Sequence, residues 1–189
     1  MIGINQVGLK KARVTSYNLI VRCPMQLIAT LAFLLLCIPV RGQSVTDAKT
    51  ESETLMNEAL PFAEKMLAKH GEFFPYGYVM KPSGEIALVA GYDGTDRPKS
   101  QVIIDLLVDG FKRDAAAGKV KATALVYDIL VVPPGGTEKS DAIAVALDHR
   151  DNYSVVVISP YVLRGGEPAV GAPFAQKGES RIFPLRASK

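Results

Sequence analysis

The hydrophobic positions along the chain follow two periods, one typical of helices and one typical of strands. Apolar residues recur at helical spacing over residues 55–70 and again over residues 98–117, and each run is followed by a glycine, Gly71 or Gly118. A spacing of three to four residues predicts a helix, and a glycine directly after it supplies a left-handed cap. Pro61 lies inside the first run and predicts a kink or a restart of that helix.

Five further segments are rich in β-branched and aromatic residues, which is typical of strands. They cover residues 73–80, 85–92, 120–132, 141–149 and 153–161. Short links separate successive segments, and such links favour antiparallel pairing. From residue 162 onward the chain is rich in Gly and Pro, so we expect an irregular tail that lies over the sheet or its edge.

The sequence therefore predicts an α+β fold with the element order α-β-β-α-β-β-β. In this fold a mainly antiparallel five-stranded sheet carries two helices on one face. We assign residues 43–54 to a polar leader and residues 55–189 to one domain that includes the tail. The order resembles the topology of profilin-like and roadblock-type sandwiches over roughly residues 55–161. That resemblance implies a binding or scaffolding module, although fold alone does not determine function.

Three short strings resemble an uncharacterised family of small bacterial proteins. They are His70-Gly71-Glu72-Phe73-Phe74-Pro75-Tyr76-Gly77, Glu138-Lys139-Ser140-Asp141-Ala142 and Pro173-Phe174-Ala175-Gln176. The resemblance covers most of the chain after residue 42 and implies a bacterial origin. It implies no activity, cofactor or site residue.

Residues 1–42 have the features of an export signal. They contain an uncharged run of 14 residues, Leu27–Val40, whereas a membrane-spanning helix needs about 20 apolar residues. Small residues precede position 43 and favour cleavage after Gly42, which predicts a secreted or periplasmic protein. An uncleaved N-terminal membrane anchor is the alternative. The true start, Met1 or Met25, is left open.

The charge distribution argues against a nucleic-acid-binding protein. The whole chain has 22 basic and 19 acidic residues, but five of the basic ones lie in residues 1–42, which contain no acidic residue. Residues 43–189 contain the remaining 17 basic residues and all 19 acidic ones, so this part of the chain is slightly acidic and predicts no basic surface. Both cysteines also lie in 1–42, and the chain has only two histidines. This ligand inventory predicts no metal site and no cofactor.

The serine and histidine positions do not predict a hydrolase. Ser140 and His149 lie at the two ends of one predicted strand, roughly 30 Å apart at about 3.4 Å per residue. We interpret His70 as a residue at a helix end and His149 as a surface residue next to a turn. No Gly-x-Ser-x-Gly elbow exposes a nucleophile. We therefore predict a protein that is not an enzyme. The alternative is a small hydrolase that uses His70 with Ser or Asp residues across the sheet.

Asp128 is a candidate binding residue because it interrupts an apolar strand. A buried carboxylate without a partner would cost several kcal/mol, so we expect Asp128 to face solvent or to serve a structural role. The alternative is that Asp128 pairs with a basic group in a concave site.

An aromatic cluster supplies the other candidate surface. Strand alternation places Phe74, Tyr76 and Tyr78 on one face and Phe73 on the other. We interpret these residues as core residues that pack against the first helix. The alternative is an interface with a partner, because a tyrosine side chain has an apolar ring and a polar hydroxyl and is therefore favoured at interfaces.

The sequence as a whole predicts an exported binding or protein-interaction module with an unknown protein partner. A periplasmic inhibitor or an immunity-type partner of a toxin is one version of it, and we expect membrane contact only through an uncleaved N-terminal segment. The candidate surface comprises His70, Phe74, Tyr76, Tyr78 and Asp128.

Overall fold

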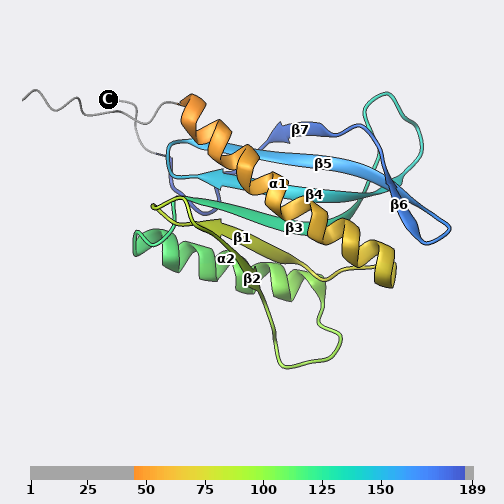
Figure 1. The fold of residues 1–189 in the computed structure, drawn as a ribbon, viewed down its shortest axis with the longest axis horizontal. Coiled ribbons are helices and arrows are strands. Elements are labelled where there is room, and N and C mark those ends of the chain that lie inside the picture. The colour runs from red at the N-terminus through yellow and green to blue at the C-terminus, as the bar shows by residue number, and fades with distance from the viewer. Residues whose placement is uncertain (1–44, 186–189) are drawn as a thin grey trace, which may run out of the picture. The chain divides into compact units, whose positions relative to one another are not determined.

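The computed structural model describes residues 45–185, which lie within one compact unit of the chain. The proposed signal segment, residues 1–42, lies outside the described residues. The elements in chain order are α1 (Val45–His70), β1 (Tyr76–Met80), β2 (Ile86–Ala90), α2 (Ser100–Ala116), β3 (Ala122–Val131), β4 (Ser140–His149), β5 (Tyr153–Arg164), β6 (Glu167–Val170) and β7 (Phe174–Lys177) (Figure 1). Within the described range, no helix combines the length and the apolar character needed to cross a membrane.

The strands form one antiparallel sheet in the order β2-β1-β3-β4-β5-β6, with β7 pairing with β5 as well. The α+β class and the two helices are confirmed, but the predicted count of five strands is wrong. The region predicted as an irregular tail contributes β6 and β7. Gly165 and Gly166, with φ of 63° and 92°, form a two-residue hairpin turn that returns β6 against β5.

Helix α1 begins ten residues earlier than the predicted start at Leu55, so the assignment of residues 43–54 to a leader is wrong for all but their first two positions. Ala48, Ser52 and Leu55 are buried at helical spacing, and two of these three side chains are small enough for close packing on the sheet. The helix also continues through Pro61 without a restart. Pro61 removes the hydrogen bond to the carbonyl of Asn57, and both residues are exposed, so water can satisfy that carbonyl.

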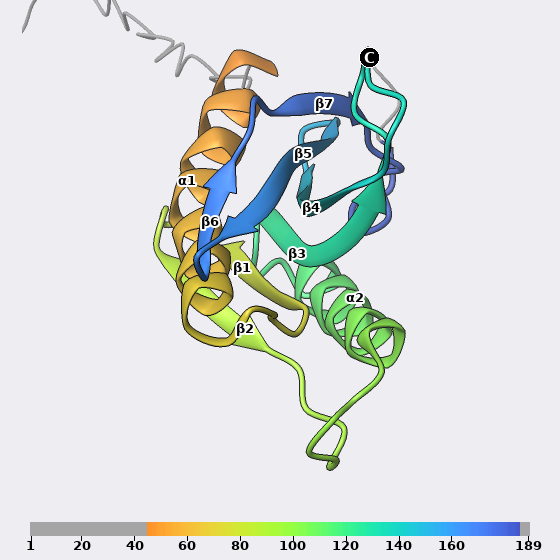
Figure 2. The same cartoon turned by 90° about the vertical axis from the view of Figure 1, so that its right-hand side faces the viewer.

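The two helices lie on opposite faces of the sheet, not on one face as predicted. Along β1, Tyr76 and Met80 pack in the cluster that contains α1, whereas Val79 packs in the cluster that contains α2. Successive side chains of a strand point to opposite faces, so this split places one helix on each side. Figure 2 shows the sheet as curved, with α1 on its outer side. Strands β3, β4, β5 and β7 enclose the inner, concave side of the sheet.

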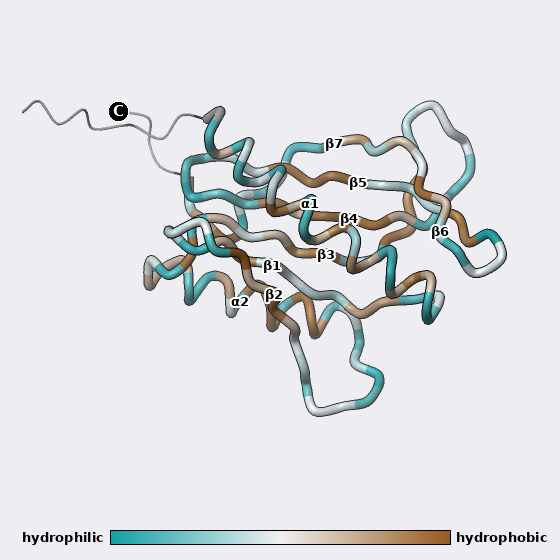
Figure 3. Tube along the Cα trace, viewed as in Figure 1, coloured by the Kyte–Doolittle hydropathy of each residue, from teal (hydrophilic) through white to brown (hydrophobic). Residues whose placement is uncertain are grey.

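The larger core lies between α1 and the centre of the sheet. Apolar residues concentrate along β3, β4 and β5 in Figure 3. Each fully buried aliphatic side chain contributes about 1.5–3 kcal/mol relative to an exposed one. The α1-side core is built mainly from Leu55, Ala59, Ala63 and Leu67 of the helix with Val126, Ile143, Val145 and Leu147 of the sheet. The α2-side core is smaller and contains Ile103, Leu107 and Phe111 of α2 with Val79 and Leu125 of the sheet.

Both helix ends follow the sequence expectation. Gly71 has a φ of 72°, and its N–H donates to the carbonyl of Leu67 at 2.8 Å. Gly118, with a φ of 67°, lies two residues after the end of α2, and its N–H donates to the carbonyl of Ala115 at 3.0 Å. The first predicted strand is shorter than expected, because β1 begins at Tyr76 and residues 72–75 form a loop. That loop carries part of the candidate site.

Candidate functional site

An apolar pocket of about 430 Å³ lies where the end of α1 meets the start of β1 and the end of β2. It is called the aromatic pocket below. Its lining consists of Phe62, Met66, His70, Glu72, Phe73, Phe74, Pro75, Tyr76, Ala90 and Gly91. The pocket therefore brings together three of the five residues that the sequence singled out, namely His70, Phe74 and Tyr76.

Tyr76 forms the buried inner wall of this pocket. Its hydroxyl donates to the carbonyl of Ala59 at 2.8 Å, and its ring makes an edge-to-face contact with Phe62, 4.8 Å between centroids. Burial raises the pKa of Tyr76 well above its usual range. Tyr76 is thus a neutral core residue whose ring remains part of the pocket lining, which agrees with the core-packing interpretation.

Phe73 lies on the same side as Tyr76, and the prediction that it faces the opposite side is wrong. Its ring makes an edge-to-face contact with Tyr76 at 6.0 Å between centroids. The prediction relied on strand alternation, but residues 72–75 precede β1 and follow no such alternation. Tyr78 is half-buried and also makes an edge contact with Tyr76, at 6.2 Å. Burial, with a smaller contribution from Glu58, raises the pKa of Tyr78.

Phe74 and His70 form the exposed side of the aromatic pocket. Phe74 is 46% exposed although its side chain is apolar, and His70 ends α1 as an exposed residue. Sequence reasoning missed Phe62 and Met66 as lining residues. A usable signal was present, because residues 62, 66 and 70 are spaced by four and therefore share one face of a helix.

The aromatic pocket adjoins a free sheet edge. Among the described strands, β2 pairs only with β1, so its other side is an edge of the sheet formed by these residues. The N–H of Lys81 donates to the carbonyl of Glu85 at 2.9 Å, which makes these two residues a hydrogen-bonded pair. Pairing alternates along an antiparallel ladder, so the N–H and C=O groups of Ile86, Leu88 and Ala90 point away from β1. Ala90 lines the pocket, and its outward backbone groups lie at its rim.

Asp128 does not belong to the aromatic pocket. It lies on β3 with an exposed side chain, and it accepts a hydrogen bond from the hydroxyl of Tyr161 at 3.2 Å. Partial burial raises the pKa of Asp128, and the Tyr161 hydrogen bond opposes this. This placement agrees with the solvent-facing and structural interpretation, and the one side-chain partner found is a tyrosine, not a basic group.

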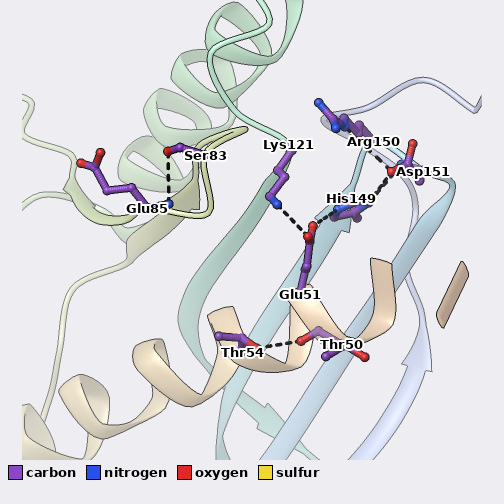
Figure 4. A network of polar contacts seen from close by, with 9 residues as sticks. All are labelled: Thr50, Glu51, Thr54, Ser83, Glu85, Lys121, His149, Arg150 and Asp151. Carbon is purple, nitrogen blue, oxygen red and sulfur yellow. Dashed lines mark hydrogen bonds and ion pairs between the residues drawn. The ribbon is translucent and has the colours of Figure 1, made fainter. Parts of the chain in front are cut away.

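His149 is completely buried, so the prediction of a surface position is wrong. Figure 4 shows Glu51 of α1 reaching two groups at the sheet, Lys121 before β3 and His149 at the end of β4. The carboxylate accepts from Lys121 Nζ at 2.6 Å and contacts His149 Nε2 at 2.9 Å. His149 Nδ1 accepts the N–H of Asp151 at 3.1 Å, so a neutral imidazole carries its proton on Nε2 and donates it to Glu51.

This buried network of Glu51, Lys121 and His149 ties the first half of α1 to the sheet. Partial burial acts to raise the pKa of Glu51, but hydrogen bonds from Lys121 and His149 outweigh it and hold that pKa below its usual value. Sequence reasoning missed Glu51 because residues 43–54 were assigned to a leader. The side chains of Lys121 and His149 are almost or completely buried, which makes the network structural.

Within residues 45–185, Ser140, His70 and His149 lie at three separate places. Ser140 and His149 occupy opposite ends of β4, as expected. Ser140 lines a depression next to Tyr161 and Val162, whereas His70 lines the aromatic pocket, which contains no serine. Within residues 45–185, no group of three or more His, Cys, Asp or Glu side chains is placed to hold a metal ion.

Comparisons with known proteins add no family to this description. The resemblances to profilin-like sandwiches and to a family of small bacterial proteins therefore stay predictions. A scan of protein-family models and searches of curated proteins and of solved structures found no match to this chain.

Proposed function

We propose that this protein is a non-enzymatic interaction module that binds an extended apolar segment of a partner protein. The observation that carries the proposal is the aromatic pocket, with its exposed Phe74, directly beside the free edge of β2. An apolar pocket favours an aliphatic or aromatic side chain, and a free edge favours a strand. Only an extended polypeptide offers both at once.

The bound segment pairs with the outward backbone groups of Ile86, Leu88 and Ala90. Side chains on one strand point alternately to the two faces, so every second side chain of the segment faces the α1 side of the sheet. On that side it meets Leu88, which is 48% exposed, and then the aromatic pocket beyond Ala90. Backbone pairing supplies affinity in this mode, and the pocket supplies specificity.

Export is part of the proposal. The proposed signal in residues 1–42 supports a secreted or periplasmic location, and the small size is compatible with an inhibitor or an immunity-type protein. Mass spectrometry of the mature protein tests the export proposal. We expect an N-terminus at Gln43, and detection of an intact segment 1–42 on the mature protein would contradict cleavage.

Selection from a random 12-residue peptide library on the immobilised protein tests the binding mode. We expect enrichment of peptides with alternating apolar residues. Binding of a selected peptide should shift the amide resonances of Ile86, Leu88 and Ala90. Phe74→Ser should weaken binding at least tenfold, whereas Leu130→Ser, which alters an even more exposed apolar residue on β3, should leave it unchanged.

Two substitutions at one position separate backbone pairing from side-chain contact. Leu88→Pro removes an outward N–H and leaves the ladder to β1 intact, whereas Leu88→Ala removes most of the side chain and keeps the N–H. We expect Leu88→Pro to abolish peptide binding and Leu88→Ala to weaken it only a few fold. Equal effects of both variants, or a peptide that shifts amides only outside β2 and the pocket, would rule out strand addition.

A further inference from the structure

A second cavity lies on the opposite face of the sheet. The α2-facing side chains of β4 are Ala142, Ala144 and Ala146, whereas the other face carries large aliphatic residues. Helix α2 packs on β1 and β3. Beyond this helix, the same face of the sheet continues along β4, β5 and β7, where the sheet is strongly curved (Figure 2). The C-terminal segment from Lys177 to Ile182 bounds the far side, which leaves an opening of about 310 Å³, called the concave cavity here.

One end of the concave cavity is polar. The strand register places Thr123, Asp148 and Ser154 in one row across β3, β4 and β5. Asp148 Oδ2 accepts the N–H of Ile182 at 3.1 Å, and Ser154 Oγ accepts the N–H of Ser180 at 3.1 Å. Two members of the row thus hold the C-terminal segment in place over the cavity.

Thr123, the third member of the row, makes no hydrogen bond to the described part of the C-terminal segment. It lines the concave cavity and is only 2% exposed, and its hydroxyl makes no hydrogen bond to any of residues 45–185. The buried side-chain atoms without a hydrogen-bond partner in the described residues are Ser52 Oγ and Asp151 Oδ2, so the Thr123 hydroxyl is accessible from the cavity that it lines. A hydrogen bond from this hydroxyl to a neutral ligand group contributes about 0.5–1.5 kcal/mol to binding.

The remaining lining indicates the rest of the ligand. Next to the polar row the walls are aliphatic, with Leu125 and Ile129 from β3 and Val156 and Ile158 from β5, above the small side chain of Ala146. Besides Tyr127, which is neutral at pH 7, the ionisable lining residues are two acids and two bases, with Asp148 and Glu179 against Lys177 and Arg181. This balance favours a ligand without net charge, because an unpaired charge is expensive to desolvate.

We propose that the concave cavity binds a small uncharged amphipathic molecule, with an aliphatic body on Ala146 and a hydroxyl or carbonyl group hydrogen-bonded to Thr123. A volume of about 310 Å³ is at the lower end of the usual range for ligand pockets, about 300–1,000 Å³. This site is separate from the aromatic pocket and does not depend on the peptide-binding proposal. A simple aliphatic alcohol, 1-octanol, has the required chemistry and serves as the probe.

Titration of the protein with 1-octanol, followed by methyl NMR, tests the site. We expect saturable shifts for Ala146, Leu125 and Ile158, and none for Ile143 and Val145 on the other face of the sheet. Absence of a saturable shift up to the solubility limit of the alcohol, or equal shifts on both faces, would overturn the proposal.

Variants test the two halves of the recognition. Ala146→Leu fills the cavity and should abolish octanol binding, and Val156→Phe provides a second blocking variant if the first fails to fold. Thr123→Val keeps the shape, removes the hydroxyl and should weaken binding roughly 3- to 10-fold. Thr137→Val, in the exposed loop before β4, is the matched control and should bind as the wild type does. Undiminished binding by both blocking variants overturns the site, and undiminished binding by Thr123→Val overturns the hydroxyl contact.

Discussion

The two faces of β4 differ in how completely they are filled. Towards α1 the strand presents Ile143, Val145 and Leu147, which are buried under a 26-residue helix. Towards α2 it presents alanines at alternating positions, and the helix on that face is shorter and packs on neighbouring strands. The strand therefore builds a closed core on one side and, at Ala146, the floor of a cavity on the other, whereas Ala142 and Ala144 are fully buried.

This difference indicates a division of work between the faces. A core of interdigitated large side chains supplies most of the stability, and a face of small side chains under incomplete cover leaves room for a ligand. Equal responses of the two faces to substitution would contradict this division.

The largest effect is expected for a deletion in the closed core. Ile143→Ala should lower the free energy of unfolding by about 4 kcal/mol, because it removes buried methyl groups and leaves a void under α1. Leu130→Ala, at a position that is 60% exposed on β3, is the control and should cost less than about 1 kcal/mol. Urea denaturation measures both values. Similar losses for the two variants would argue against a closed core at Ile143.

The next largest effect concerns the attachment of α1. Glu51→Gln should destabilise the protein by about 3 kcal/mol, because it leaves the almost buried ammonium of Lys121 without its countercharge. Glu53→Gln, on the exposed side of the same helix and 3.7 Å from Lys49, should change stability by less than about 0.5 kcal/mol. Thermal unfolding of both variants decides the point, and equal melting temperatures would contradict a structural role for the network.

The α2 face of the sheet is tightly packed directly under α2. The concave cavity is therefore a local opening beyond the helix. A Cβ on Gly77 would collide with the ring of Phe111 and would lie 2.9 Å from the carbonyl of Ala124. Gly77→Ala should therefore cost about 2 kcal/mol through overpacking. Gly84→Ala is not a suitable control, because Gly84 has a φ of 93°. Gly110→Ala, in α2 with only Arg113 nearby, should be neutral or stabilising, and chemical denaturation compares the two.

The pH dependence distinguishes two carboxylates. Hydrogen bonds from Lys121 and His149 hold the pKa of Glu51 below its unfolded value, so its stabilising contribution is present above that value and is lost as the pH falls through the folded pKa. Burial raises the pKa of Asp148, so its ionised form destabilises the fold at neutral pH and acidification relieves this.

Unfolding free energies from pH 7 down to pH 3 test these opposite signs. The deficit of Glu51→Gln relative to the wild type should shrink on acidification. Any advantage of Asp148→Asn at neutral pH should also shrink, because the wild-type carboxyl becomes neutral. A deficit of Glu51→Gln that grows as the pH falls would show that the pKa of Glu51 is not lowered in the folded state.

Much of the fold follows from the sequence where one period dominates. Helix α2 and strands β4 and β5 lie close to their predicted ranges, because their apolar spacing is regular and turn residues mark their ends. The start of α1 was missed because only small residues, Ala48 and Ser52, mark its buried side. The last two strands were missed because Gly and Pro were interpreted as irregular, although Gly165-Gly166 is a hairpin signal.

The sequence of β1 contains a signal that the two helices lie on opposite faces of the sheet. Tyr76 and Met80 are apolar on one face, and Val79 with Gly77 is apolar on the other, which indicates a strand covered on both sides. Within the candidate site, the cluster of aromatic residues can be recognised in the sequence. The residues of α1 and β2 that line the pocket with it cannot, because they depend on how the β1–β2 hairpin packs against α1. The concave cavity depends on strand register and sheet curvature, which local sequence does not determine.

A matched pair of alanine substitutions tests most directly whether the two faces differ. Ala124→Val adds methyl groups on the α1 face of β3, and Ala146→Val adds the same groups on the α2 face of β4 at the concave cavity. Equilibrium unfolding in urea should show a loss of about 2 kcal/mol for Ala124→Val. Ala146→Val should stay within about 0.5 kcal/mol of the wild type, because the cavity accepts the added volume. Equal losses at the two positions would contradict an open α2 face.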